Sequence, residues 1–263
     1  KQHRRFEQVL DVTRAAELRR IDTVGGQLRI GAAATLTEAF AALTAVWPQL
    51  HSFASRFAGL PVRNSGTLGG NVANGSPIGD SMPLLIALGA EVVLASVRGE
   101  RVLPLENLYT GYRQNVMAAD ELLTQIRVPL PQPATGPDAP TALLRAYKIS
   151  KRFDDDISAV CLVVHLHLQG GVVQQARIGA GGVAATPARA RATEAALVGQ
   201  PWTAATVARA QQALAGEFQP ISDMRASSAY RRTVLRNLLE RLWRESQGET
   251  LVSVERLRLE ELA

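Results

Sequence analysis

The chain has 263 residues, of which 46% are hydrophobic, 20% are charged and 5% are aromatic. Its formal charge of +5 arises from 29 basic residues spread among 24 acidic ones. With so few aromatic residues, this pattern argues against a nucleic-acid-binding surface and favours either a solvated basic surface or a docking face for an acidic partner subunit. The absence of a run of about 18 uncharged apolar residues and of a signal-peptide core excludes a membrane-spanning helix and indicates a cytoplasmic protein.

Helix and strand signals alternate through the first half of the chain. Thr35 and Glu38 have the spacing of a capping box, which predicts the start of a helix there. Pro83 suits the first turn of another helix, because its missing N–H has no partner at that position anyway. Strands are predicted within 27–36, 90–96 and 122–130, and helices over 37–46, from Pro48 to near Gly59, and from Pro83 to Gly89.

A proline-rich segment, "PQPATGPDAP" (131–140), is the clearest boundary in the chain and predicts an extended connector or exposed loop. After it, a strand is expected over 142–150 and a hairpin over 158–183, with Gly170 and Gly171 at its turn. Helices are predicted within 187–199, 203–214 and 227–245. The sequence therefore predicts two α+β domains, 1–132 and 141–263.

The stretch "NSGTLGGNVANGSPIGDS" (64–81) is rich in glycine and small polar residues. It matches neither the phosphate-binding loop that ends in Gly-Lys-Ser/Thr nor the dinucleotide fingerprint G-x-G-x-x-G. Backbone N–H groups in tight turns bind anions, whereas Asp80 would repel phosphate and accept hydrogen bonds from sugar-type hydroxyls. A ligand with both parts, such as a dinucleotide, would use both features; the alternative is an ordinary irregular loop.

Three further residues are weaker candidates for chemistry. His165 and His167 alternate on a predicted strand and share a face with Cys161. No carboxylate lies near them in the sequence, so partly exposed strand residues are favoured and no metal site is expected. Cys161 is the single cysteine, which excludes a disulfide framework and an iron–sulfur cluster held by this chain alone, and it is predicted to be a packed thiol.

The segment "KISKRFDDDIS" (148–158) has two interpretations. Its spacing favours a turn with aspartate caps. If the loop instead lies near a redox-active ring, Lys148 and Arg152 would stabilise electron-rich forms and Asp155 would oppose them.

Residues 57–83, "FAGLPVRNSGTLGGNVANGSPIGDSMP", resemble the second flavin-binding motif of the xanthine dehydrogenase family, in its FAD-carrying subunit or domain. The likeness continues in order through 111–113, 121–129, 147–158, 179–190 and 228–239 and so covers essentially the whole chain. Bacterial xanthine dehydrogenases with the flavin on a small subunit look most similar, and the flavoprotein subunits of carbon monoxide dehydrogenase look more distant.

This resemblance implies an α+β fold: the C-terminal part of an FAD-binding domain of the vanillyl-alcohol-oxidase type, then a smaller domain of the carbon monoxide dehydrogenase flavoprotein C-terminal type. It also implies site residues. Phe57 would pack at the flavin ring, Thr67, Gly69, Gly70 and Asn71 would follow the pyrophosphate and ribityl chain, and Asp80 would bind ribityl or ribose hydroxyls. Leu123 would lie near the adenine or ring system, and Lys148 would lie on the flavin side of the site. Tyr112 and Arg113 would lie toward the nicotinamide entrance. Asp155 would lie in an acidic loop that tunes the redox potential of the flavin.

The function implied is electron transfer within a molybdenum hydroxylase, with xanthine dehydrogenase as the first choice. Purine would be oxidised on a molybdenum-binding large subunit, and electrons would pass through partner 2Fe–2S clusters and FAD to NAD. No acid or base indispensable to purine oxidation is expected in this chain, and the assembly would be a dimer of heterodimers. The alternatives are a flavoprotein subunit of a carbon monoxide, aldehyde or N-heterocycle hydroxylase, and a flavin-free scaffold of the same fold.

One part of the family pattern is missing from the sequence. The first flavin motif, a "GGTD"-like turn that cradles the pyrophosphate, is absent, as is the iron–sulfur domain with its cysteines. Because the sequence begins with Lys1 rather than Met, we expect both to lie in an N-terminal part of the same polypeptide.

Overall fold

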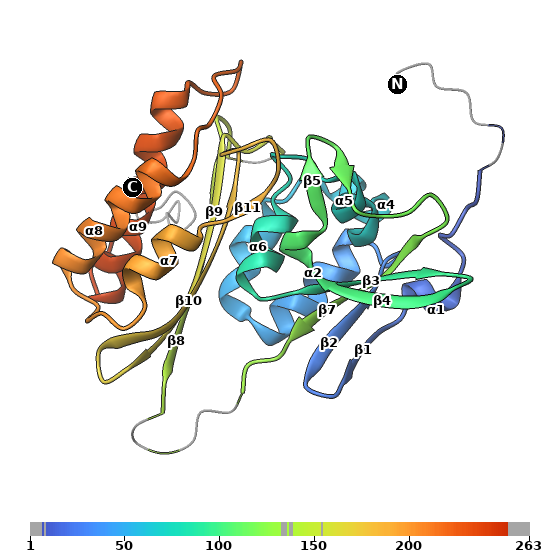
Figure 1. The fold of residues 1–263 in the computed structure, drawn as a ribbon, viewed down its shortest axis with the longest axis horizontal. Coiled ribbons are helices and arrows are strands. Elements are labelled where there is room, and N and C mark those ends of the chain that lie inside the picture. The colour runs from blue at the N-terminus through green and yellow to red at the C-terminus, as the bar shows by residue number, and fades with distance from the viewer. Residues whose placement is uncertain (1–6, 8, 133–135, 137–138, 154, 252–263) are drawn as a thin grey trace, which may run out of the picture.

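The computed structural model describes residues 7, 9–132, 136, 139–153 and 155–251. They form two larger β-sheets and a small two-stranded one, with helices packed around them (Figure 1). Within these ranges, no helix is both long and apolar enough to cross a bilayer.

The first sheet has five antiparallel strands in the order β1-β2-β7-β3-β4. The strands are β1 (Ile21–Val24), β2 (Gln27–Gly31), β3 (Glu91–Ser96), β4 (Gly99–Pro104) and β7 (Leu122–Pro129). A short hairpin of β5 (Tyr109–Gly111) and β6 (Gln114–Asn115) lies between β4 and β7 in the chain.

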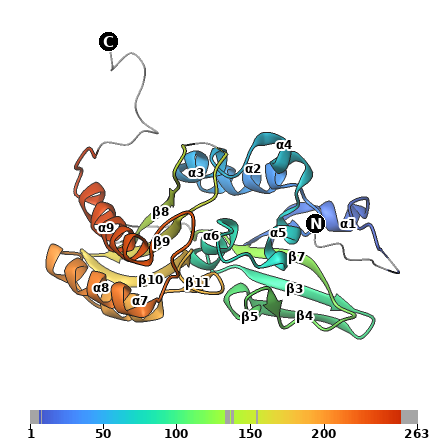
Figure 2. The ribbon, with the colours of Figure 1, turned by 90° about the horizontal axis from the view of Figure 1, so that it is seen from above.

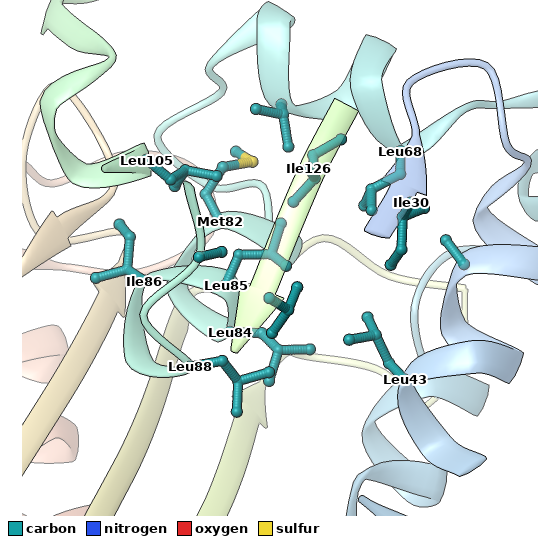
Figure 3. Close-up of a cluster of buried hydrophobic side chains, with 14 of the residues drawn as sticks. Ile30, Leu43, Leu68, Met82, Leu84, Leu85, Ile86, Leu88, Leu105 and Ile126 are labelled. Carbon is teal, nitrogen blue, oxygen red and sulfur yellow. The ribbon is translucent and has the colours of Figure 1, made fainter. Parts of the chain in front are cut away.

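Helices cover one face of this sheet (Figure 2). They are α2 (Leu36–Val46), α3 (His51–Ser55), α4 (Leu60–Ser65), α5 (Leu68–Asn74) and α6 (Ser81–Ala87), with α1 (Ala16–Arg19) near β2 and 3-10 turns at Pro48–Leu50 and Leu105–Asn107. Because side chains alternate along a strand, Ile30 of β2 and Ile126 of β7 point into the same core as Leu43 of α2 (Figure 3).

The second sheet has the order β11-β10-β9-β8 and contains the longest strands. These are β8 (Thr141–Ile149), β9 (Val160–Gln169) and β10 (Val172–Gly181), with the short β11 (Ala188–Arg189) at the edge. Helices α7 (Arg191–Leu197), α8 (Ala204–Glu217) and α9 (Ser228–Ser246) cover one face (Figure 1). Val160 and Leu162 of β9 pack toward these helices, whereas Cys161 and Val163 pack into the core of the first half.

Helix α6 lies between the two sheets (Figure 1). All seven of its residues are buried, which fits the rule that a helix surrounded by protein is apolar all round. Leu84 and Leu85 join the first core, and Gly179 of β10 approaches Pro83 so closely that an added Cβ would clash with its backbone. The two halves of the chain are therefore packed directly on each other.

Several sequence predictions are confirmed here. Thr35 and Glu38 form the capping box at the start of α2, and Gly170 and Gly171, both at positive φ, make the turn between β9 and β10. Cys161 is a buried thiol, 1% exposed. The predicted connector 131–140 lies partly outside the described residues.

One prediction needs correction, and the irregular loop that the sequence left open as an alternative for 64–81 does not describe that whole stretch. The helix expected from Pro48 to Gly59 ends at Ser55, because the chain turns there and Ala58 takes a positive φ before α4 begins at Leu60. The glycine-rich stretch is not irregular throughout, since it contains the end of α4 and all of α5.

Candidate functional site

A cavity of about 330 Å³ opens where α4, α5, the start of α6 and the loop between β8 and β9 meet. Most of its wall comes from the segments 57–62, 71–80 and 155–158, together with Lys148. Of the predicted site residues, Phe57, Asn71, Asp80, Lys148 and Asp155 line it. A larger cavity of about 460 Å³ lies along α9, and no predicted site residue lines that one.

The glycines of the motif allow close approach within the chain itself. Thr67 caps α5, and its Oγ1 accepts a hydrogen bond from the Gly70 N–H at 3.0 Å. Gly69 packs on the segment after β2: its N–H donates to the carbonyl of Ala32, and a Cβ there would lie 2.6 Å from that oxygen. Thr67, Gly69 and Gly70 fix the position of α5, whose Asn71 reaches the cavity.

Asp80 and Lys148 form a buried ion pair at the bottom of the cavity. Lys148 Nζ lies 2.6 Å from Asp80 Oδ2, and it also donates to Ser158 Oγ at 3.0 Å. The two charged side chains are only 5% and 3% exposed. Buried charges are tolerated when they are paired in this way. Each of the two residues therefore compensates the buried charge of the other, although 68 positions separate them in the sequence.

The other oxygen of Asp80 is the unusual feature of the site. Asp80 Oδ1 is buried and has no hydrogen-bond partner among the described residues. Such groups are rare because leaving a buried acceptor unpaired costs free energy. A hydroxyl donor from a ligand in the cavity would satisfy it, as the sequence predicted for this carboxylate.

Cys161 lies beneath this pair. Burial raises the pKa of its thiol well above the ordinary value, and the nearby Asp80 carboxylate raises it further. The thiolate is the reactive form of cysteine, so this buried thiol fits the packed side chain that the sequence predicts.

Arg56 fixes the loop that forms the third wall, a role that the sequence did not indicate. Its Nε donates to the carbonyl of Phe153 at 3.0 Å and its Nη1 to that of Lys148 at 3.2 Å. Its guanidinium also lies over the Phe153 ring, 4.7 Å from the centroid. The loop is thereby attached to the end of α3.

Two residues near the cavity take the left-handed backbone conformation that normally suits glycine. Ala58 has φ 51° and Asp155 has φ 47°. The Asp155 carboxylate lies over Gly59, where an added Cβ would be 3.1 Å from its Oδ1. Backbone strain of this kind is concentrated at functional sites, because the surrounding structure must hold it in place.

The remaining predicted residues do not line the cavity. Leu123 is a residue of β7, and its side chain packs in the core of the first half of the chain. Tyr112 and Arg113 lie exposed at the β5–β6 turn, with the Arg113 guanidinium 5.5 Å from the Tyr112 ring centroid. Arg152 is exposed and pairs with Asp156. Phe57, in contrast, lines the cavity, and its ring packs against Phe40 with 4.9 Å between the ring centroids.

The two histidines share a face of β9, as predicted, with their ring centroids 4.7 Å apart. Burial and, to a smaller extent, the neighbouring His167 lower the pKa of His165 to about 4. The structure contains no cluster of three or more potential metal-ligating side chains within the described ranges.

Family models match most of the chain. Residues 1–131 match the model described as the FAD binding domain in molybdopterin dehydrogenase, and residues 145–246 match the CO dehydrogenase flavoprotein C-terminal domain. The nicotinate hydroxylase of Emericella nidulans is 35% identical over 71% of this chain, but the match spans only 14% of that longer protein.

Two bacterial relatives match over most of their own length. The carbon monoxide dehydrogenase medium chain of Hydrogenophaga pseudoflava is 30% identical over 89% of this chain and 80% of its own. A solved structure of that enzyme superposes with a TM-score of 0.78 at 30% identity, covering 86% of this chain and 76% of the other. The xanthine dehydrogenase FAD-binding subunit of Escherichia coli O157:H7 is 29% identical over 92% of this chain and 82% of its own. The expected closer likeness to xanthine dehydrogenase is therefore not found.

Proposed function

This chain belongs to the family of FAD-binding subunits of molybdenum hydroxylases, and from that premise we propose that it binds FAD at the cavity lined by Asp80 and Lys148. The observation that carries the proposal is the buried Asp80 Oδ1, which has no hydrogen-bond partner among the described residues. A hydroxyl of the ribityl chain or of a ribose would donate the missing hydrogen bond to this oxygen. The cavity volume accommodates part of such a molecule.

The donor set of the cavity fits this ligand. Asn71, Asn74 and Ser76 supply neutral polar groups on one wall, and Phe57 supplies an aromatic ring. A bound FAD supplies the redox chemistry, and the protein supplies binding, orientation and the electrostatic field. We propose that Phe57 packs at the flavin, that Thr67, Gly69, Gly70 and Asn71 follow the pyrophosphate and ribityl chain, and that Leu123 and Lys148 complete the site.

Charges at the end of β8 and on the loop that follows it would set the electrostatic field at the flavin. Asp155 lines the cavity and opposes a gain of negative charge there, whereas Lys148 favours it. Lys148 pairs with Asp80 and Arg152 with Asp156, so in each case the partner carboxylate weakens the effect of the cation on the site. These residues tune the cofactor and do not exchange protons with the substrate.

For the whole enzyme, we propose a xanthine dehydrogenase. Purine oxidation would take place on a molybdenum-binding large subunit, with 2Fe–2S clusters on a further partner domain or subunit and NAD as the acceptor, approaching past Tyr112 and Arg113. The likeness to the Escherichia coli subunit supports this choice. We further propose two domains, 1–132 and 141–263, a cytoplasmic location and a dimer of heterodimers.

A second substrate class has support of the same strength. The carbon monoxide dehydrogenase medium chain and the nicotinate hydroxylase are as similar in sequence as the xanthine dehydrogenase subunit. Oxidation of carbon monoxide or of an N-heterocycle is therefore the alternative. A flavin-free scaffold is disfavoured by the unpaired Asp80 Oδ1.

The test is a visible spectrum of the native complex, followed by identification of the extracted flavin. We expect FAD, bleached by xanthine and by NADH. Bleaching by carbon monoxide or nicotinate instead would favour the alternative substrate class. A native complex without flavin would overturn the proposal that this chain binds FAD. Asp80→Ala should lose most of the flavin, whereas Asp22→Ala, on the distant strand β1, should retain it.

A further inference from the structure

Ser81 connects the two polar walls of the cavity. It follows Asp80 directly, is the first residue of α6 and is 1% exposed. Its hydroxyl donates to Oδ1 of Asn71, with 2.5 Å between the oxygens. Asn71 belongs to α5 and lines the cavity. Ser81, which does not line the cavity, therefore holds the Asn71 side chain, which does.

This contact determines which end of the Asn71 amide is available. An asparagine side chain has an oxygen that only accepts hydrogen bonds and a nitrogen that only donates them. The Ser81 hydroxyl occupies the oxygen, and no residue that the structure describes accepts from the Asn71 nitrogen. The two N–H donors of Asn71 are therefore the part left for a ligand.

The hydroxyl of Ser81 is not needed for the helix it begins. The N-cap position of α6 is Asp80, and the Ser81 hydroxyl bonds across to another helix instead of to a backbone group of its own. Alanine has a higher helix propensity than serine, and the Ser81 hydroxyl does not cap α6, so the helix itself does not require a serine at this position. The hydroxyl also lies 3.3 Å from the Met82 sulfur, which is only a weak acceptor, so the Asn71 oxygen is its strong partner and the contact that requires a hydroxyl.

We propose that Ser81 is a positioning residue that fixes the Asn71 amide with its N–H donors toward the bound ligand. The cavity then presents donors at Asn71 and an acceptor at Asp80 Oδ1, both set by the consecutive residues 80 and 81. This pattern fits a ligand segment that carries acceptor oxygens next to hydroxyl groups, such as a polyol attached to a phosphate. The inference rests on the proposed binding of FAD and names how one wall of that site is organised.

The test is a double-mutant cycle on FAD affinity, measured by titrating the flavin-depleted native complex with FAD. Ser81→Ala should weaken binding about 5- to 10-fold, which corresponds to one well-placed hydrogen bond. In an Asn71→Ala background the same change should have no further effect. Ser81→Thr, which keeps the hydroxyl, should restore most of the affinity.

A matched control is Thr193→Val in the second half of the chain. Thr193 is fully buried, and its hydroxyl donates to Glu217 at 2.7 Å. This variant should lower the thermal stability of the complex and leave FAD affinity unchanged. Equal losses from Ser81→Ala with and without Asn71 would overturn the inference, as would unchanged affinity in Ser81→Ala. Failure of the wild-type complex to bind FAD would overturn the proposed function and the inference together.

Discussion

At the scale of single residues, the ion pair between Asp80 and Lys148 serves both stability and binding, and a substitution can separate the two. Lys148→Met would leave a buried carboxylate without its cation, which typically costs about 3–5 kcal/mol of unfolding free energy. The double variant Asp80→Asn with Lys148→Met removes both charges, so we expect it to regain most of that loss. Denaturant unfolding of the three proteins measures this.

The same double variant should still bind FAD more weakly than the wild type, because a neutral amide oxygen is a weaker hydrogen-bond acceptor than a carboxylate oxygen. If Lys148→Met alone were as stable as the wild type, the pair would not be the buried, mutually dependent contact that the structure shows.

Gly69 and Gly216 should respond in opposite ways to alanine. At Gly69, a Cβ would lie 2.6 Å from the carbonyl oxygen of Ala32, and backbone cannot move aside as a flexible side chain can. We expect Gly69→Ala to cost roughly 1–3 kcal/mol. Gly216 lies in α8 with nothing within 4 Å of its added Cβ, so Gly216→Ala should stabilise the protein by about 0.5–1 kcal/mol.

Thermal unfolding of both variants tests this pair of expectations. A neutral Gly69→Ala would mean that α5 can shift away from Ala32, and the cavity wall formed by Asn71 would then not be rigid.

At the scale of elements, the sequence predicts what is local. The capping box of Thr35 and Glu38 and the turn at Gly170 and Gly171 were predictable because all the groups involved lie within three residues of each other. Helix α5 was not, because its glycines disfavour a helix and only the cap at Thr67 and the packing on Ala32 offset that.

Contacts between elements that are far apart in the chain also could not be predicted from the sequence. Arg56 bonds to the carbonyls of Lys148 and Phe153, more than 90 positions away, and no motif indicates such a partner. The chemistry of the residues indicated Asp80 and the charges of 148–158 as candidates, and the resemblance to a flavoprotein family supplied the other site residues. The pairing of Asp80 with Lys148 could not be predicted either, because it needs the positions of both α6 and β8.

Glu106 joins elements from both halves of the chain. Its carboxylate accepts from Arg177 of β10 and Arg189 of β11 at 2.9 Å each, and from Arg191 of α7 at 2.6 Å, while its own side chain is 9% exposed. Glu106→Gln keeps the shape and removes the charge that three arginines share. We expect it to lower the unfolding free energy by about 2–3 kcal/mol.

Glu240→Gln is the matched control for this substitution. Glu240 pairs with Arg244 on the surface of α9, with both side chains nearly half exposed, and such pairs contribute about 0–1 kcal/mol. Chemical denaturation of both variants gives the comparison. Equal effects would show that the Glu106 cluster adds no more than a surface pair.

At the scale of the whole molecule, the cavity exists because two sheets pack on one helix. Asp80 comes from the first half of the chain and Lys148 from the second, and Leu144 and Cys161 of the second sheet belong to the core of the first half. Any loosening of the contact between the halves would therefore separate the two charges. We infer that cofactor binding and the packing of the halves stabilise each other, because a ligand that binds only the packed state favours it.

His165 makes this packing dependent on pH. It lies on the face of β9 that packs toward α6, near Ala87, His167 and Arg177, and burial holds its pKa at about 4 against an ordinary 6.5. Between pH 6.5 and 4, the unfolded chain therefore binds a proton that the folded protein does not. Stability should fall as the pH decreases through that window, by up to about 3 kcal/mol, and the loss should be complete below pH 4.

The contribution of His165 is isolated by comparison with a variant. His165→Gln cannot take up the proton, so its unfolding free energy should fall less between pH 7 and pH 4.5 than that of the wild type. His51→Gln, in the exposed first turn of α3, should follow the wild type. Parallel curves for the wild type and His165→Gln would contradict this account, because carboxylates elsewhere would then carry the whole pH dependence.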